Sequence, residues 1–528
     1  MNIPILSIVT FLPLALAFLI LFIPKERSTH IKTIVLTGSI LNFLISLVLY
    51  FRFDPQTAAP QFVEKWEWLG FGINYHMGID GISLFLILLT TFLMPIVILS
   101  SWRYITKQVK EYHIFMLILT TGIIGVFVSL NLFLFYVFWE AMLIPMYFLI
   151  GIWGGGRRIY ATVKFVLYTM VGSLLMLVAI FYLYSSYYKA TGIFSLNIFD
   201  FHQFAIPPNV QIWLFLAFAL AFAIKVPMFP FHTWLPDAHV EAPTAGSVVL
   251  AAVLLKMGAY GFLRFAMPIF PDALKIFLPY LSVLALIGII YGGLMALIQK
   301  DIKSLVAYSS VSHMGLIMLA MFSLNATAVE GSIYQMLNHG LSTGALFLCV
   351  GILYERAHTR LIKDYGGVSK VMPVFSVFFL ICMLSSVGLP GLNGFVGEIL
   401  CVFGVFQTNK VLAILCVSTI ILAAAYLLWM FQRVMQGPIT NEKVRSFKDL
   451  NLREIMIFVP IILLMFFMGI YPKPFLRKMD ASVEHLLKKI QPKQVVLEET
   501  PLSKLPDDLQ IPSQEQENTR VIKDVNQP

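Results

Sequence analysis

Apolar runs of about twenty residues alternate with short polar segments along most of the chain. A helix rises about 1.5 Å per residue, so each run can cross the roughly 30 Å hydrocarbon core of a bilayer. The pattern therefore predicts an all-α polytopic membrane protein with about fourteen transmembrane helices. The expected spans are residues 3–23, 31–51, 79–101, 112–130, 132–152, 163–188, 210–230, 243–268, 273–298, 302–323, 331–354, 372–407, 411–432 and 454–471.

Two of these spans are interrupted by proline and glycine. Span seven breaks at Lys225-Val-Pro227-Met-Phe-Pro230, and span twelve breaks between Val387 and Gly394. The two breaks lie five spans apart, and an odd displacement reverses a helix in the membrane. Spans four to eight and nine to thirteen are therefore expected to form two inverted five-helix repeats, although two kinks among so many spans can also arise by chance.

The predicted organisation follows from these spans. We expect an N-terminal three-helix segment at 1–111, a first repeat at 112–270, a second repeat at 271–436 and a last span within 437–473. Residues 474–528 are polar and rich in proline, so this tail is expected to be an exposed amphipathic or disordered extension.

Composition and charge support the membrane assignment. The chain is 59% hydrophobic and 12% charged, which in practice excludes a water-soluble fold. A net charge of +9 would suggest nucleic acid in a soluble protein, but here the basic residues lie mainly in short loops. Loops after odd-numbered spans carry twenty Lys and Arg residues, and loops after even-numbered spans carry six. The positive-inside rule therefore places odd-span exits in the cytoplasm and both chain ends outside.

The four cysteines limit the possible chemistry, and the start of the chain indicates how the first span is processed. The four cysteines all lie in apolar segments without CxxC spacing, which argues against iron–sulfur, zinc or disulfide roles. The first run has no basic region before it and no small-residue cleavage site after it, so we interpret it as a retained span.

Four charged side chains lie inside predicted spans, where each must face a partner or a wet cavity. They are Glu140, Lys225, Lys256 and Glu398. A lysine at mid-span costs roughly 2.5 to 3.5 kcal/mol on insertion scales, so its presence needs a reason. Static ion pairs that fix helix packing are the structural alternative.

Histidines extend this set. His313 and His339 lie in spans ten and eleven among hydroxyl and amide residues, where each could equally be a hydrogen-bonded core histidine. His232, Asp237 and His239 lie beside the break in span seven, where they could line an entry path or cap the broken helix. Buried lysine, nearby carboxylate and histidine together suit proton transfer, because small changes in surroundings shift their proton affinities.

Several motifs carry a family resemblance across most of the membrane part. The most specific is Ala223-Ile-Lys225-Val-Pro-Met-Phe-Pro-Phe-His232-Thr-Trp-Leu-Pro-Asp237-Ala-His239, and others surround Asp80, Glu140, His313 and Glu398. The chain resembles the antiporter-like proton-translocating subunits of NADH-quinone oxidoreductase, the respiratory complex I. Glu398 favours the chain-4 type, because the sister subunits resemble this motif but carry lysine there.

The resemblance implies one proton channel in the membrane arm of the complex, and the basic loops favour a bacterial plasma membrane. Glu140 and Lys225 would form a gating pair, Lys256 a connecting lysine, His313 and His339 relay positions, and Glu398 the terminal proton carrier. It also implies that the chain itself holds no flavin, iron–sulfur cluster or quinone, which belong to partner subunits, and that its partners are neighbouring antiporter-like subunits and membrane lipids.

Three alternatives remain open on the sequence. The first is a subunit of a multi-subunit cation/proton antiporter. The second is the equivalent subunit of a membrane-bound hydrogenase, or of a ferredoxin-linked or photosynthetic complex. The third is a membrane redox protein that ligates b-type haem through His313 and His339, which requires these histidines on facing helices.

Overall fold

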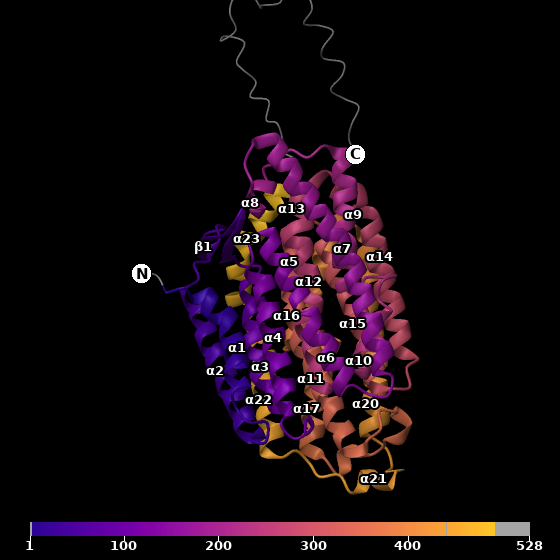
Figure 1. Ribbon diagram of the computed structural model, residues 1–528. Coiled ribbons are helices and arrows are strands. Elements are labelled where there is room, and N and C mark those ends of the chain that lie inside the picture. The colour runs from indigo at the N-terminus through magenta and orange to yellow at the C-terminus, as the bar shows by residue number, and fades with distance from the viewer. Residues whose placement is uncertain (1–2, 440, 491–528) are drawn as a thin grey trace, which may run out of the picture. The chain divides into compact units, whose positions relative to one another are not determined.

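A computed structural model describes residues 3–439 and 441–490, and these residues form a bundle of long helices (Figure 1). Within this part, twelve helical segments are long and apolar enough to cross a membrane. They are Ser28–Arg52 (α2), Leu84–Ser101 (α3), Val109–Val128 (α4), Leu132–Trp153 (α5 and α6), Arg158–Thr191 (α7), Pro208–Lys225 (α9), Thr244–Ile269 (α11 to α13), Pro271–Leu297 (α14), Ile302–Met321 (α15), Ala326–Ala357 (α16), Lys410–Met435 (α19 and α20) and Leu452–Ile470 (α22).

Three shorter apolar helices fall in the remaining predicted spans. They are Ile5–Leu21 (α1) in span one, and Pro373–Val387 (α17) and Asn393–Thr408 (α18) in span twelve. The prediction of a helical polytopic membrane protein is therefore confirmed, while the count of fourteen spans and the inverted repeats stay predictions. The short connecting helices are Ile198–Phe201 (α8), Trp234–Glu241 (α10) and Glu442–Arg445 (α21), with 3₁₀ turns at Ile362–Asp364 (η3) and Val368–Lys370 (η4).

Both breaks lie where the proline and glycine pattern places them. Helix α9 ends at Lys225, and the chain turns before α10 begins at Trp234. Pro227 contributes to this end because it has no N–H to continue the hydrogen-bond ladder. Helix α17 ends at Val387, and Gly388 follows with φ +82°, a left-handed conformation that glycine adopts without strain.

Span eight contains an irregularity that the sequence pattern did not indicate. Two π-helical segments, Leu250–Leu254 (η1) and Phe262–Ala266 (η2), flank the short helix Leu255–Gly261 (α12). Helices α11, Thr244–Val249, and α13, Met267–Ile269, complete the span. A π-helical turn adds a residue to the helix and is often found at functional sites.

A β-hairpin corrects the expectation of a purely helical fold. Strand β1 (Gln61–Gly70) pairs antiparallel with β2 (Ile73–Ile79), between α2 and α3. The Glu64 carboxylate accepts hydrogen bonds from the backbone of Leu6 at 2.7 Å and of Ser7 at 3.1 Å, so it satisfies free N–H groups at the start of α1. The hairpin was missed because its strands are too short and polar to register among apolar runs of span length.

The first part of the expected tail is amphipathic, as one of the two alternatives had it, but it packs on the bundle and is not exposed. Residues Lys473–Ile490 form the amphipathic helix α23, whose apolar face is buried against the bundle. Ser482 Oγ accepts from the backbone of Gly81 at 2.9 Å, and Lys478 Nζ donates to the carbonyls of Tyr50 and Phe53 at 3.0 and 3.2 Å. The apolar positions recur every three or four residues, which is the spacing of one helical face. The remainder of the predicted tail, 491–528, lies outside the described residues.

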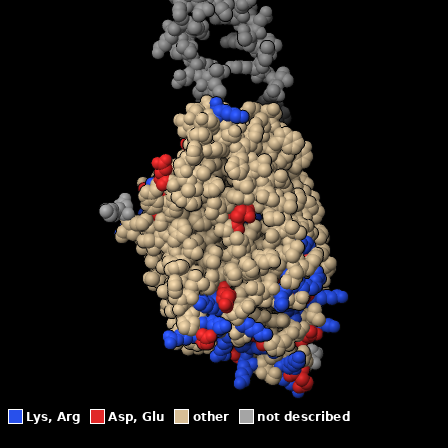
Figure 2. Space-filling model, viewed as in Figure 1, with Lys and Arg blue, Asp and Glu red and all other residues tan. Residues whose placement is uncertain are grey.

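Basic side chains gather at one end of the bundle. Figure 2 shows Lys and Arg concentrated at the lower end of the view, where α21 lies in Figure 1, and a flank almost free of charge above it. This asymmetry is the spatial counterpart of the loop charges counted in the sequence.

Docking of α23 should depend on its buried face. Val483 is fully buried, and Val483→Asp would place a carboxylate there at a cost of about 3 kcal/mol or more. We expect α23 to detach, which limited trypsin digestion would detect as faster cleavage after Lys488 and Lys489. Glu484→Gln, at an exposed neighbouring position, should digest like the unaltered chain, and equal rates for Val483→Asp would contradict the packing.

Candidate functional site

Four of the predicted residues form one buried chain of contacts. Lys256 Nζ lies 2.6 Å from His339 Nδ1, the rings of His339 and His313 are 5.9 Å apart between centroids, and His313 Nδ1 lies 3.4 Å from Glu398 Oε1. All four side chains are at most 4% exposed. A lysine, two histidines and a carboxylate therefore follow one another through the core of the bundle.

Helix capping positions the two histidines. The side chain of Asp301 caps α15 by accepting from the backbone of Lys303 and Ser304, and that of Asn325 caps α16 by accepting from Ala328. These caps begin the two helices that carry His313 and His339, and the helices pack against each other. Lys256 comes from α12, between the two π-helical segments, and its ammonium group also donates to the carbonyl of Ala251 in η1.

Amide and hydroxyl side chains surround Glu398. Gln335 Nε2 donates to its Oε1 at 3.4 Å, and Asn338 Nδ2 donates to Gln335 Oε1 at 3.0 Å. Asn393, the first residue of α18, donates to Asn338 at 3.2 Å and accepts from Ser385 Oγ at 2.6 Å. Glu398 Oε2 has no hydrogen-bond partner among the described residues. This oxygen is the one position in the carboxyl group that is open to a further proton or water.

Lys225 and Glu140 are close but do not touch. Lys225 is 1% exposed, and its ammonium group lies 3.3 Å from Met142 Sδ and 5.5 Å from the ring centroids of both Trp139 and Phe165. Glu140 is near enough to act on it electrostatically, yet no hydrogen bond or ion pair joins the two in the described part of the chain. Glu140 Oε1 is buried without a hydrogen-bond partner. The predicted gating pair is therefore separated here.

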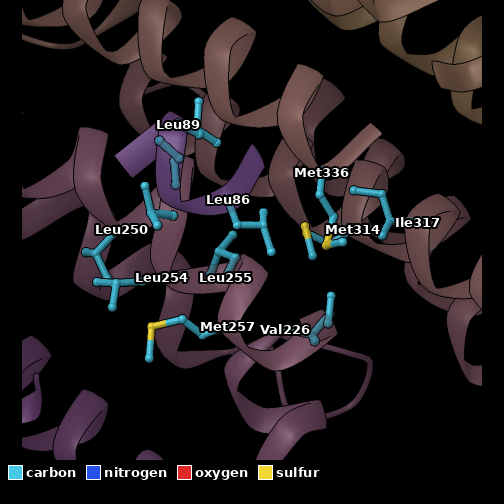
Figure 3. Close-up of a cluster of buried hydrophobic side chains, with 14 of the residues drawn as sticks. Leu86, Leu89, Val226, Leu250, Leu254, Leu255, Met257, Met314, Ile317 and Met336 are labelled. Atoms are coloured by element: carbon cyan, nitrogen blue, oxygen red, sulfur yellow. The ribbon is translucent and has the colours of Figure 1, made fainter. Parts of the chain in front are cut away.

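Buried apolar residues adjoin Lys225 and Lys256 in the sequence and belong to the core where α9 and α12 are in contact. In Figure 3, Val226 lies beside a cluster that includes Leu255, Met257 and Met314, the sequence neighbours of Lys225, Lys256 and His313. Helix α12 approaches α9 closely, since a Cβ on Gly258 would lie 2.7 Å from the Phe222 carbonyl. Among the described residues no hydrogen bond or ion pair links Lys225 to Lys256, so the charged groups form two clusters.

The residues beside the first break are not joined into a path. His232 packs against Phe229 and Tyr291, and His239 stacks on the Phe347 ring with centroids 4.7 Å apart. The ring nitrogens of both histidines have no hydrogen-bond partner among the described residues, so neither histidine caps the broken helix.

In the described part of the chain, Asp237 forms ion pairs with basic residues and not with His232 or His239. It pairs with Lys164 at 2.7 Å and with Arg157 at 3.8 Å, toward the basic end of the bundle. The entry path through His232, Asp237 and His239 stays a prediction.

The polar side chains that hold Glu398 in place were not among the predicted site residues. Gln335, Asn338, Asn393 and Ser385 are polar side chains inside spans, and Asn338 directly precedes His339. The cost of leaving an amide unpaired in hydrocarbon is a signal that points to such residues. Their partners, however, come from other helices and are not visible in the chain order.

The helix arrangement and the buried charge chain define a class, that of antiporter-like membrane subunits. The family model described as NADH:quinone oxidoreductase/Mrp antiporter matches residues 129–423, and the model for NADH-ubiquinone oxidoreductase chain 4, amino terminus, matches residues 7–129.

Similar proteins narrow this class. NADH-quinone oxidoreductase subunit M of Rhodobacter capsulatus is 47% identical over 91% of this chain and 96% of its own length. NADH-ubiquinone oxidoreductase chain 4 of Arabidopsis thaliana is 48% identical over 90% of this chain and 95% of its own. The chain therefore belongs to the family of NADH-quinone oxidoreductase subunit M, or chain 4, as its motifs predicted.

Solved structures agree with this assignment. A chain of respiratory complex I from Thermus thermophilus with bound NADH matches with a TM-score of 0.84 and 32% identity, over 92% of this chain and 100% of that one. A chain of the Mrp complex from Dietzia matches with a TM-score of 0.78 over 93% of this chain and 100% of that one, but at 18% identity, so this likeness shows the fold alone.

Close packing beside Glu398 leads to a test. A Cβ on Gly397 would lie 2.2 Å from Gln335 Oε1 and 2.5 Å from Asn338 Nδ2. Gly397→Ala should push α18 away from α16 and destabilise the assembled complex by about 1–3 kcal/mol, as overpacking does. Thermal unfolding of the purified complex would measure this. Gly151→Ala, where the nearest atom is at 3.7 Å, is the matched control and should unfold like the unaltered complex.

Proposed function

We propose that this chain moves protons through the membrane arm of NADH-quinone oxidoreductase. Family membership makes it a subunit of that proton-translocating enzyme. The observation that carries the proton role is the buried series Lys256, His339, His313 and Glu398, which come from four different helices. Each of these side chains can gain and lose a proton, and spacings of this size are bridged by direct hydrogen bonds or by a water molecule.

The proposed transfer runs along the order of the groups, from Lys256 to Glu398. The Lys256 ammonium can donate to His339 Nδ1, and an imidazole can accept a proton on one nitrogen while releasing another from its second. His313 then faces Glu398, whose Oε2 is open to a proton. Glu398 is therefore the terminal carrier, and the network of Gln335, Asn338 and Asn393 keeps its carboxyl group in place.

Glu140 and Lys225 suit a gate because, among the described residues, Lys225 has no carboxylate partner and Glu140 Oε1 has no hydrogen-bond partner. Thioether sulfur and aromatic faces are weaker partners for an ammonium ion than a carboxylate is. Closing the pair would stabilise both charges and favour the protonated lysine, and opening it would favour release of the proton. Two arrangements with similar free energies can be shifted by a modest input from a neighbouring subunit.

The free energy for this shift comes from electron transfer in partner subunits. In this proposal the flavin, the iron–sulfur clusters and the quinone belong to those subunits, and the chain couples to them through neighbouring antiporter-like subunits. His232, Asp237 and His239 are the proposed entry side, and the two repeats, 112–270 and 271–436, would supply the two halves of the path.

The alternatives have less support. The cation/proton antiporter hypothesis rests on the family model that also names the Mrp antiporter and on a fold shared at 18% identity, whereas the relatives named for the oxidoreductase are 47–48% identical. A membrane-bound sulfane sulfur reductase complex is likewise similar at 22% identity, which shows fold alone. The haem hypothesis has less support because the family models and the relatives at 47–48% identity are named for the oxidoreductase.

Removing the charge of Glu140 should disable the gate. Glu140→Gln keeps the size of the side chain but cannot form an ion pair with Lys225. We expect proton pumping by the assembled enzyme in vesicles to fall about fivefold or more, the lower end of typical coupling energies, with a parallel fall in NADH-quinone turnover. Glu442→Gln, at an exposed position, is the control. Unchanged pumping and turnover in Glu140→Gln would refute the gating role.

The charge asymmetry also predicts an orientation. We place the basic end in the cytoplasm of a bacterium and both chain ends on the outer side of its plasma membrane. The four native cysteines are buried, so a membrane-impermeant maleimide should react mainly with introduced sites. Lys443→Cys should react only in inside-out vesicles, and Lys473→Cys only in right-side-out vesicles. The opposite labelling pattern would reverse the proposed topology.

A further inference from the structure

A cavity of about 290 Å³ lies outside the proton chain, at the end of the bundle opposite the basic loops. Figure 1 places α8, α13 and α23, which contribute to its wall, toward the upper end of the view. The polar side chains that line it are Asp80, His202, Arg264, Ser482, His485 and Lys489. Four of the six can carry positive charge and one can carry negative charge.

The single carboxylate is already satisfied. Asp80 Oδ1 pairs with Arg264 at 2.6 Å and accepts from the backbone of Ile82 at 3.1 Å and Ser83 at 3.2 Å. Arg264 also donates through Nε to the Tyr260 hydroxyl at 3.1 Å. Arg264 and Asp80 are both buried, and their opposite charges cancel. The pair therefore has no net negative charge to balance a second cation.

Lys489 is a second cation in the cavity wall, in addition to Arg264. Its Nζ lies 3.0 Å from His202 Nδ1, and it forms no ion pair with any of the residues 3–439 and 441–490. Burial, together with the charges of Lys489 and Arg264, lowers the pKa of His202 to about 3, so this histidine is neutral and accepts from the ammonium group. A half-buried ammonium whose partner is a neutral ring leaves positive charge uncompensated in the cavity.

We propose that this cavity binds a phosphate-type oxyanion, with Lys489 and His485 as its ligands and with His202 positioning Lys489. A charge-assisted hydrogen bond from Lys489 would supply the missing negative partner. The volume accommodates a phosphate group, and the apolar walls formed by Phe199, Leu263, Pro268 and Leu486 would accept the carbon chain of a phosphate ester. Inorganic phosphate and a phospholipid headgroup share this chemistry. The proposal is independent of the proton path.

Binding should strengthen as pH falls. Burial and the neighbouring charge of Lys489 lower the pKa of His485, so its ring is mainly neutral near pH 7. A bound anion would oppose those effects and favour the protonated ring, which by linkage means tighter binding at pH 6 than at pH 8. The charged and titratable groups that act on His485 or face it across the cavity are Asp80, His202, Arg264, Lys488 and Lys489.

Hydrogen–deuterium exchange of the purified, delipidated complex can test this, read on peptides of α23. The probes are sodium phosphate against sodium chloride, and nanodiscs of phosphatidylglycerol against phosphatidylcholine. We expect phosphate or phosphatidylglycerol to slow exchange in α23 several-fold, and phosphatidylglycerol, whose phosphodiester keeps its charge, to do so more at pH 6 than at pH 8. Protection by sodium phosphate identifies a free oxyanion as sufficient, and protection by phosphatidylglycerol alone identifies the lipid headgroup as the source.

Variants make the test specific. Lys489→Gln, and separately His485→Gln, should weaken the response to the probe by roughly tenfold in its half-maximal concentration, as loss of a charge-assisted hydrogen bond does. Lys488→Gln, which removes an exposed lysine paired with Glu484, should respond like the unaltered complex. Equal protection in the unaltered complex and in both cavity variants, or no protection by any probe, would overturn the proposal.

Discussion

The cost of placing charge at the depth of a bilayer governs this structure. A charged side chain in the hydrocarbon region is tolerated only where the protein itself supplies a partner, because lipid supplies none. Lys256 meets this requirement with a histidine and a backbone carbonyl, and Glu398 meets it with His313 and Gln335. The helices that carry these residues must therefore pack in the one relative position that keeps the charged groups in contact.

Irregular backbone occurs where this requirement is strongest. Lys225 ends a helix, Lys256 lies between two π-helical segments, and Glu398 follows a break that begins with Gly388 in a left-handed conformation. Each irregularity leaves backbone carbonyl or amide groups free of the regular ladder, and these groups can serve buried charges. Gly388 also makes room directly, since a Cβ there would lie 2.4 Å from Glu398 Oε2. The regular helices cross the membrane, and the charged residues lie at or near the places where the helices are interrupted.

The lack of a hydrogen bond between the two charged clusters, among the described residues, has a functional meaning within the proposed mechanism. If Lys225 were joined to Lys256 by continuous hydrogen bonds, protons could leak in both directions without coupling. No hydrogen bond links them among the described residues, and the buried apolar neighbours Val226, Leu255 and Met257 belong to one cluster (Figure 3). In a pump, protons must cross this separation only when the gate changes state. Glu140, whose Oε1 has no hydrogen-bond partner among the described residues, lies near Lys225 and can control that change.

The sequence by itself determined the membrane class, the positions of the helical spans, the two breaks and the ionisable residues inside the spans. These features are local, because hydrophobic run length, proline, glycine and charge act on the segment that contains them. Tertiary structure alone decided which charges meet: Lys256 and His339 touch although they are 83 residues apart, while Glu140 and Lys225 do not touch. It also decided that residues 473–490 dock as α23 and that β1 and β2 pair. The physical reason is that helix rotation and side-chain contacts depend on the packing of segments distant in the chain, which no local pattern specifies.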